Sequence, residues 1–70
     1  MYLVIELQTN SGQITNLAYA YETQAEAESK FHAVLSSAAV SSVEIHSAVI
    51  LDEYGCILGN GSYTHGEENE

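Results

Sequence analysis

The side chains best suited to metal or nucleophilic chemistry in this 70-residue chain are three histidines and one cysteine: His32, His46, His65 and Cys56. Imidazole and thiolate are common zinc ligands, and the sequence signal for a zinc site is a short repeat such as C-x₂-C or H-x₃-H. No pair among these four residues has that spacing. We therefore predict no bound metal and no cofactor. His32, His46 and His65 are the candidate ligands if the fold brings them together.

Cys56 is the candidate nucleophile, with His46 or His65 as its base. A reactive thiolate needs a neighbouring cation or a second cysteine. The chain has one cysteine, and Lys30 is its single Lys or Arg. A small one-helix sheet also leaves little room for a substrate pocket, which occupies about 300 Å³ or more. We interpret Cys56 as a small apolar residue at a strand start, assign no catalytic residue and predict that the chain is not an enzyme.

Acidic residues dominate the charge of the chain, because ten Asp and Glu stand against one Lys and the formal net charge is −9. This charge repels nucleic acid and favours a basic protein as partner, for example one that handles nucleic acid. No apolar run approaches the ~18 residues of a membrane span, and residues 1–6 lack the basic start of a signal peptide. A single cysteine suits a reducing compartment, so we predict a cytoplasmic protein that binds neither membranes nor nucleic acid.

Alternating apolar residues predict four β-strands, over residues 2–9, 14–22, 43–51 and 56–64. Between the second and third strands, Thr23 and Glu26 form a capping box, and apolar residues then recur at helical spacing for about four turns. If this connection passes over the first strand, the sheet order is second, first, third, fourth, with every neighbour antiparallel.

We therefore predict an α+β fold of order ββαββ, a four-stranded antiparallel sheet with one helix packed on one face. It forms a single domain over residues 1–65, followed by an acidic disordered tail over residues 66–70. One helix cannot cover both faces of a sheet, and the uncovered face is too apolar to be wholly solvated. We expect a homodimer through that face, or a partner protein docked there. The predicted interface consists of residues of that face together with Tyr54, which lies in the expected turn after the third strand. Its residues are Tyr2, Val4, Ala18, Ala20, Ala48, Ile50 and Tyr54.

Three stretches of the chain carry a resemblance to a known group of proteins: residues 25–43 (AEAESKFHAVLSSAAVSSV), 46–51 (HSAVIL) and 63–65 (YTH). Together they resemble small uncharacterised proteins encoded in prophages and mobile elements of gut Firmicutes. The resemblance extends over most of the chain up to His65 and brings no catalytic residue with it. It implies a phage-derived accessory protein in the cytoplasm of a bacterial host.

These features together predict a non-enzymatic protein–protein interaction module of phage or prophage origin. It would act by binding a host or phage protein, for instance as an inhibitor of host defence. Two alternatives stay open. A small metal- or ligand-binding protein would use the histidines, and a virion assembly component would use the uncovered sheet face to join its neighbours.

Overall fold

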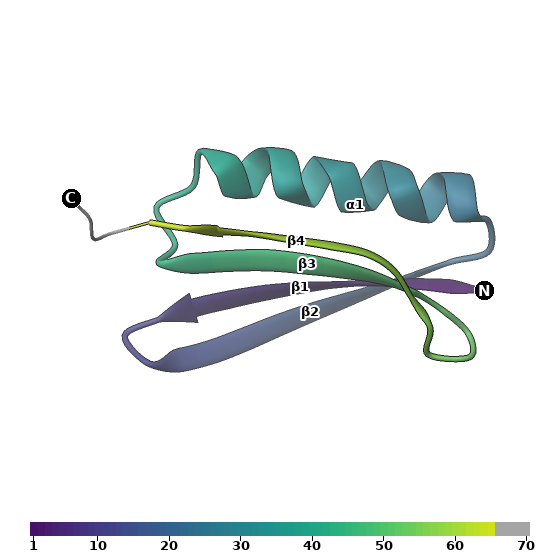
Figure 1. The fold of residues 1–70 in the computed structure, drawn as a ribbon, viewed down its shortest axis with the longest axis horizontal. Coiled ribbons are helices and arrows are strands. Elements are labelled where there is room, and N and C mark those ends of the chain that lie inside the picture. Colours follow the sequence, from purple (N-terminus) through teal and green to yellow (C-terminus); the bar gives the residue numbers. More distant parts are fainter. Residues whose placement is uncertain (66–70) are drawn as a thin grey trace.

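The structure, a computed structural model, describes residues 1–65 and has the predicted order of two strands, a helix and two strands (Figure 1). The tail predicted at residues 66–70 lies outside the described residues. Each strand begins and ends within two residues of its predicted bounds. The elements are β1 Tyr2–Asn10, β2 Gln13–Tyr21, α1 Gln24–Ala39, β3 Ile45–Asp52 and β4 Ile57–Thr64.

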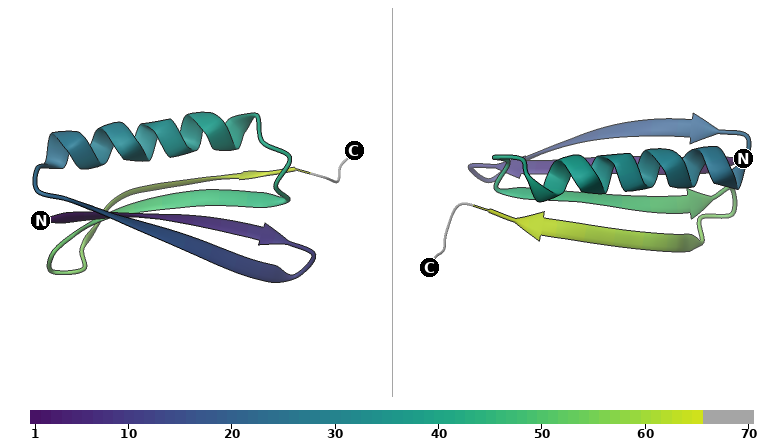
Figure 2. Two further views of the ribbon diagram at one scale, coloured as in Figure 1. Left: turned by 180° about the vertical axis from the view of Figure 1, so that it is seen from behind. Right: turned by 90° about the horizontal axis from the view of Figure 1, so that it is seen from above.

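The strands form one antiparallel sheet in the order β2-β1-β3-β4, which confirms the predicted fold class. α1 packs on one face of the sheet, chiefly over β3 and β1. Seen from above in Figure 2, the helix runs along the strands and leaves β2 and β4 to either side. Within residues 1–65, no helix is long and apolar enough to cross a membrane.

A two-residue loop joins β1 to β2 and sets their register. Ser11 and Gly12 both have positive φ, 54° and 80°, as in the type I′ turn that matches the twist of a tight hairpin. Gly12 adopts this conformation readily because it has no Cβ. The loop pairs Asn10 with Gln13, so even-numbered residues of β1 lie opposite odd-numbered residues of β2.

α1 begins at the predicted cap. Thr23 Oγ1 accepts a hydrogen bond from Glu26 N at 3.2 Å, and its hydroxyl donates to Glu26 Oε1 at 3.1 Å. Such bonds satisfy N–H groups of the first turn that have no partner inside the helix. The helix ends at Ala39 without a glycine, and Val40 N donates to Ser37 O.

The core lies between α1 and the sheet. Its buried apolar residues, each at most 7% exposed, are Val4, Ala27, Phe31, Val34, Ala38, Ala48 and Ile50. Partly buried side chains pack against this cluster from its margins: Tyr2, Tyr19, Tyr21 and Leu35. The helix thus contributes two alanines and two larger residues, Phe31 and Val34, to the core.

The prediction of which sheet face is uncovered is wrong for the residues on β1 and β3. Val4, Ala48 and Ile50 lie under the helix and are at most 2% exposed, and Tyr2 packs against the same core. The prediction placed even-numbered residues of the first three strands on one face, but the loop at Gly12 shifts β2 out of phase with β1. On β1 and β3 the helix covers the side that was predicted to be free, whereas on β2 it covers the opposite side.

Two of the predicted interface residues do lie on the uncovered face. Ala18 pairs with Ile5 and Ala20 with Leu3, on the side away from the helix. Tyr54 belongs to neither face, because it lies in the turn between β3 and β4, where it is 84% exposed. Asp52 Oδ1 accepts hydrogen bonds from Tyr54 N and Cys56 N, each at 2.9 Å.

Candidate interaction face and buried histidine network

The sheet face that α1 leaves uncovered carries the larger aliphatic side chains. Successive residues of a strand point to opposite faces, so this face takes the odd-numbered residues of β1 and β3 and the even-numbered residues of β2. β4 adds Ile57, which pairs with Leu51. We call its apolar residues the open face: Leu3, Ile5, Leu7, Ile14, Ala18, Ala20, Ile45, Val49, Leu51 and Ile57.

Solvent reaches much of the open face. Ile14, Ile45 and Ile57 are 67%, 42% and 61% exposed, and none of the ten residues is buried. Clusters of exposed aliphatic side chains on this scale mark interaction sites in soluble proteins.

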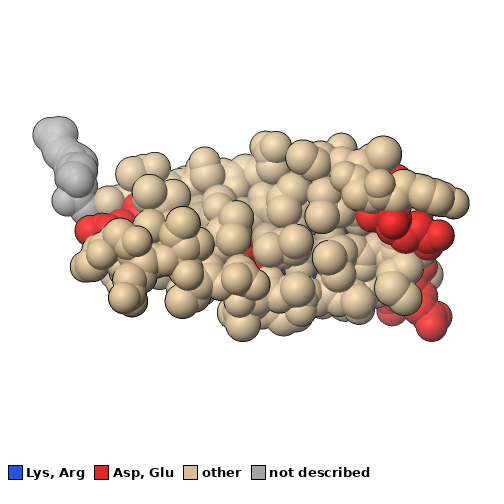
Figure 3. Space-filling view, turned by 90° about the horizontal axis from the view of Figure 1, so that it is seen from below, with Lys and Arg blue, Asp and Glu red and all other residues tan. Residues whose placement is uncertain are grey.

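Acidic side chains gather at the ends of the open face. Figure 3 shows the molecule from the side opposite to α1, with acidic residues at both ends and a nearly uncharged surface between them. Glu22, Glu44 and Glu53 each lie directly outside a strand. In the strands that the structure describes, no position pointing to this side is Asp, Glu or Lys. An uncharged centre with a polar rim is the usual anatomy of a protein interface.

Among the depressions on the surface of residues 1–65 are the following two, both open. One of about 230 Å³ lies on the open face between β1, β3 and β4, where Ser47 and Ser62 are small beside Leu7. The other, of about 360 Å³, lies between α1 and β2, beside Lys30, whose Nζ is 4.2 Å from the ring centroid of Tyr19. Neither is lined by a histidine or by the cysteine, so neither brings the candidate chemical residues to a substrate.

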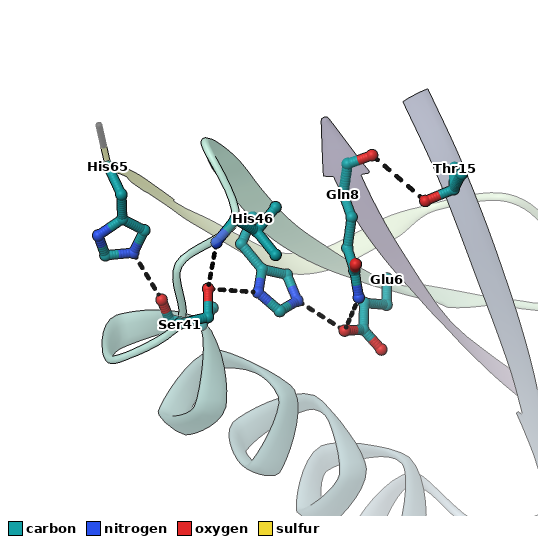
Figure 4. A network of polar contacts seen from close by, with 8 residues as sticks. Glu6, Gln8, Thr15, Ser41, His46 and His65 are labelled. Carbon is teal, nitrogen blue, oxygen red and sulfur yellow. Dashed lines mark hydrogen bonds and ion pairs between the residues drawn. The ribbon is translucent and has the colours of Figure 1, made fainter. Parts of the chain in front are cut away.

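His46 lies in the core, 4% exposed, and is held there by polar partners from two other segments (Figure 4). Its Nε2 is 2.6 Å from Glu6 Oε2 of β1, and its Nδ1 is 3.1 Å from Ser41 Oγ, just beyond α1. Gln8 Nε2 donates to the same Glu6 oxygen at 2.9 Å. Both ring nitrogens of this buried side chain therefore have partners, as burial of a polar group requires.

Burial and hydrogen bonding act on Glu6 in opposite directions. Removal from water raises the pKa of the Glu6 carboxyl, since it disfavours the charged form. Hydrogen bonds from His46 and Gln8, with the charges of His46 and Lys30, outweigh this effect and hold the pKa below its ordinary value. Glu6 is thus ionised at neutral pH and accepts a hydrogen bond from Nε2–H of His46.

Glu6, His46 and Ser41 have the connectivity of a hydrolytic triad. Their surroundings argue against that chemistry. Ser41 follows the C-terminal end of α1, where the helix dipole is negative and opposes the oxyanion of an acyl-transfer intermediate. Its Oγ also accepts a hydrogen bond from Val43 N at 3.3 Å. We interpret the three residues as a network that holds the end of α1 to the sheet.

The other candidate residues do not join His46. His65 Nε2 donates to Ala38 O at 2.8 Å and so caps the C-terminal end of α1. His32 is exposed on α1. Cys56, predicted as the first residue of the last strand, lies one residue before β4 and is exposed. Within residues 1–65, no three His, Cys, Asp or Glu side chains are grouped to hold a metal ion.

Sequence reasoning missed Glu6, Ser41 and most of the open face. The signal for Glu6 is a carboxylate at the centre of an otherwise apolar strand, which requires a partner if that face is covered. The row Leu3, Ile5 and Leu7 is plain in the sequence, but alternation alone does not tell which side the helix takes.

Comparisons of the chain with protein-family models, with curated proteins and with solved structures found no match. The resemblance to prophage proteins stays a prediction that rests on the residues quoted for it. We therefore argue function from the open face and its charge pattern.

Proposed function

We propose that this protein is a non-enzymatic interaction module of phage or prophage origin, cytoplasmic in its host, whose open face binds a second copy of the chain. The observation that carries the proposal is the direction of the aliphatic row on β1. Leu3, Ile5 and Leu7 point away from α1, while Glu6 lies beneath it. A chain of this length buries only about 60% of the surface that its unfolded form exposes, so covering this face would add substantial stability.

The size of the open face is just above the lower limit for a specific dimer interface. Strands of nine residues are about 30 Å long, and four strands about 4.8 Å apart make a sheet about 19 Å wide. Two such footprints together bury about 1,100 Å², which exceeds the roughly 1,000 Å² expected of a specific interface. Stacked sheets lie about 10 Å apart, and a two-fold pair would form an α/β/β/α sandwich.

Charge explains why a second copy suits this face better than the rest of the surface. Two chains that each carry a net charge of −9 repel one another. On the open face, the strand residues that the structure describes include no acidic side chain, so this repulsion is weakest there (Figure 3). Salt screens the repulsion between the acidic ends, so self-association would strengthen as salt rises. Binding of a basic partner would weaken under the same change.

The dimer would leave its helices and acidic ends free for a host or phage protein. A basic protein is the partner that the net charge of −9 favours, which fits an inhibitor of a protein that handles nucleic acid. The metal-binding alternative has less support, because His32, His46 and His65 lie in three separate environments.

Val49→Glu tests the face-to-face contact. Val49 is partly exposed on the open face and pairs with Ile5, so a carboxylate there points to solvent in one chain and into the apolar contact in the pair. Light scattering after size exclusion should give half the mass of the wild type, while the matched control Val49→Thr should keep the wild-type mass. An unchanged mass for Val49→Glu at all salt concentrations would refute the contact.

A further inference from the structure

β2 is an edge strand of the sheet with none of the usual protection against pairing. It lies at the end of the order β2-β1-β3-β4, and its sequence QITNLAYAY contains no charged residue and no proline. Edge strands of monomeric proteins are commonly guarded by lysine, proline, bulges or a covering element. α1 packs chiefly over β3 and β1, so the helix leaves this edge uncovered.

The other edge of the sheet is protected by its irregularity. β4 has a register shift opposite Ile50 and Leu51, and it carries Gly59 and Gly61. A bulge twists an edge and interrupts the regular ladder, while glycine weakens a strand. β2 pairs with β1 without interruption from Tyr21 to Gln13, so the two edges differ in their readiness to accept another strand.

The hairpin shows which backbone groups of β2 are free. In a two-residue hairpin the residues that flank the loop exchange both hydrogen bonds, so Gln13 and every second residue after it face β1. The intervening residues direct their N–H and C=O groups outward from the edge: Ile14, Asn16, Ala18 and Ala20. These four residues also have uncharged side chains, so no charge obstructs an approaching strand.

We propose that the β2 edge is a second self-association surface, where β2 of one chain pairs antiparallel with β2 of another about a two-fold axis at Leu17. This register places Ile14, 67% exposed, opposite Ala20 of the second chain, and Asn16 opposite Ala18, so larger residues meet smaller ones. Leu17 meets its own copy at the axis on the helix side, where it is 50% exposed.

Charge also favours this register. Glu22 directly follows β2 and falls opposite Gly12 of the second chain, so no two carboxylates are paired. In a chain of net charge −9, an edge that brings no two carboxylates together is a specific place for a second copy to bind.

The pairing extends the sheet to twice its width and keeps both open faces on the same side. It depends on the edge alone and does not require the face-to-face contact.

Ala18→Pro tests the edge, because it removes a donor that points outward and leaves the ladder to β1 intact. Ala18 also belongs to the open face, so Ala18→Val is the matched control: it adds similar volume to that face but keeps the N–H. We expect the wild type to contain four chains of 7.6 kDa, and Ala18→Pro and Val49→Glu two chains each. The double variant should be monomeric, and Ala18→Val should match the wild type.

The masses of the wild type, Ala18→Pro and Val49→Glu separate failure of the edge from failure of the open face. A dimeric wild type, a dimeric Ala18→Pro and a monomeric Val49→Glu would overturn the edge pairing and keep the open-face contact. A wild type and a Val49→Glu of equal mass, with a monomeric Ala18→Pro, would keep the edge and refute the open face.

Amide hydrogen exchange tests the same edge without any substitution, which matters if Ala18→Pro does not fold. In the paired wild type, the amides of Ile14, Asn16, Ala18 and Ala20 should exchange as slowly as those of their neighbours that face β1. Fast exchange at all four, beside slow exchange at Thr15 and Leu17, would overturn the proposal.

Discussion

Glu6→Gln should lower stability at neutral pH and lose that effect in acid. The substitution keeps an oxygen that accepts a hydrogen bond from His46 Nε2 but removes the negative charge. The Glu6 side chain is 12% exposed and that of His46 5%, so solvent screens their interaction little. A hydrogen bond to a charged group contributes about 1.5–3 kcal/mol and a neutral one about 0.5–1.5 kcal/mol. The difference, reduced by the easier burial of a neutral amide, is about 1 kcal/mol.

The sign of the pH dependence follows from the lowered pKa of Glu6. Folding holds the pKa of this carboxyl below its ordinary value of 4.5, so the folded state binds the proton more weakly than the unfolded state. The stabilisation is fully present above pH 4.5 and is lost as pH falls through the folded pKa. Wild type and Glu6→Gln should therefore differ at neutral pH and converge below the folded pKa.

Urea denaturation followed by circular dichroism measures this effect at a fixed chain concentration, which keeps any self-association constant. In a domain of this size, about 1 kcal/mol also corresponds to about 4–8 °C in Tm. Glu22→Gln is the matched control, because Glu22 is exposed and loses the same charge. A difference between Glu6→Gln and wild type that stays constant from neutral to acid pH would refute the assignment of this stabilisation to the ionised Glu6 carboxylate.

Other substitutions test the cap, the close approach of helix and sheet, and the corrected face. Thr23→Ala removes the acceptor for Glu26 N and should lower stability by about 1 kcal/mol, with Thr23→Ser close to wild type; equal Tm values for all three would contradict the capping role. Gly61→Ala would place a Cβ 3.0 Å from Leu35 Cδ1 and should cost about 1 kcal/mol of stability in the wild type but nothing in a Leu35→Ala background, as a double-mutant cycle would show. Val4→Glu buries a charge at a site that is 0% exposed and should destabilise by about 3–5 kcal/mol, whereas Val49→Glu should stay folded by circular dichroism; a folded Val4→Glu would contradict the placement of the core.

The elements of this fold could be predicted because each has a local signal. Alternation marked the strands, and the Thr23–Glu26 spacing marked the helix start. The assumption that the connection passes over the first strand gave the observed strand order. The faces could not be predicted with the same success, because they depend on register. One residue of difference in the loop at Gly12 would exchange the two sides of β2 relative to β1.

The network at His46 lay beyond sequence reasoning for a different reason. Glu6 and His46 are 40 residues apart, and they meet because the antiparallel register of β1 and β3 places Gln8 opposite His46. Ser41 joins them because α1 ends just above the start of β3. Contacts between residues so far apart in the sequence leave no local sequence motif, whereas a metal site with closely spaced ligands would have had one.

The arrangement of polar and aliphatic residues in the sheet is hard to reconcile with a chain that stays alone. Glu6, Gln8 and His46 lie on the covered side, where they must be satisfied by one another and by Ser41, while Leu7 and Val49 face outward. A lone chain would gain from the reverse arrangement, because about 25 cal/mol is recovered for each Å² of apolar surface removed from water and buried polar groups lose hydration. Two stacked copies, as proposed, would remove this disadvantage, since the outward aliphatic residues would then form a second core between the sheets. The buried network would in turn hold α1 in place on the outer surface of the pair, so both sides of the sheet acquire a reason for their composition.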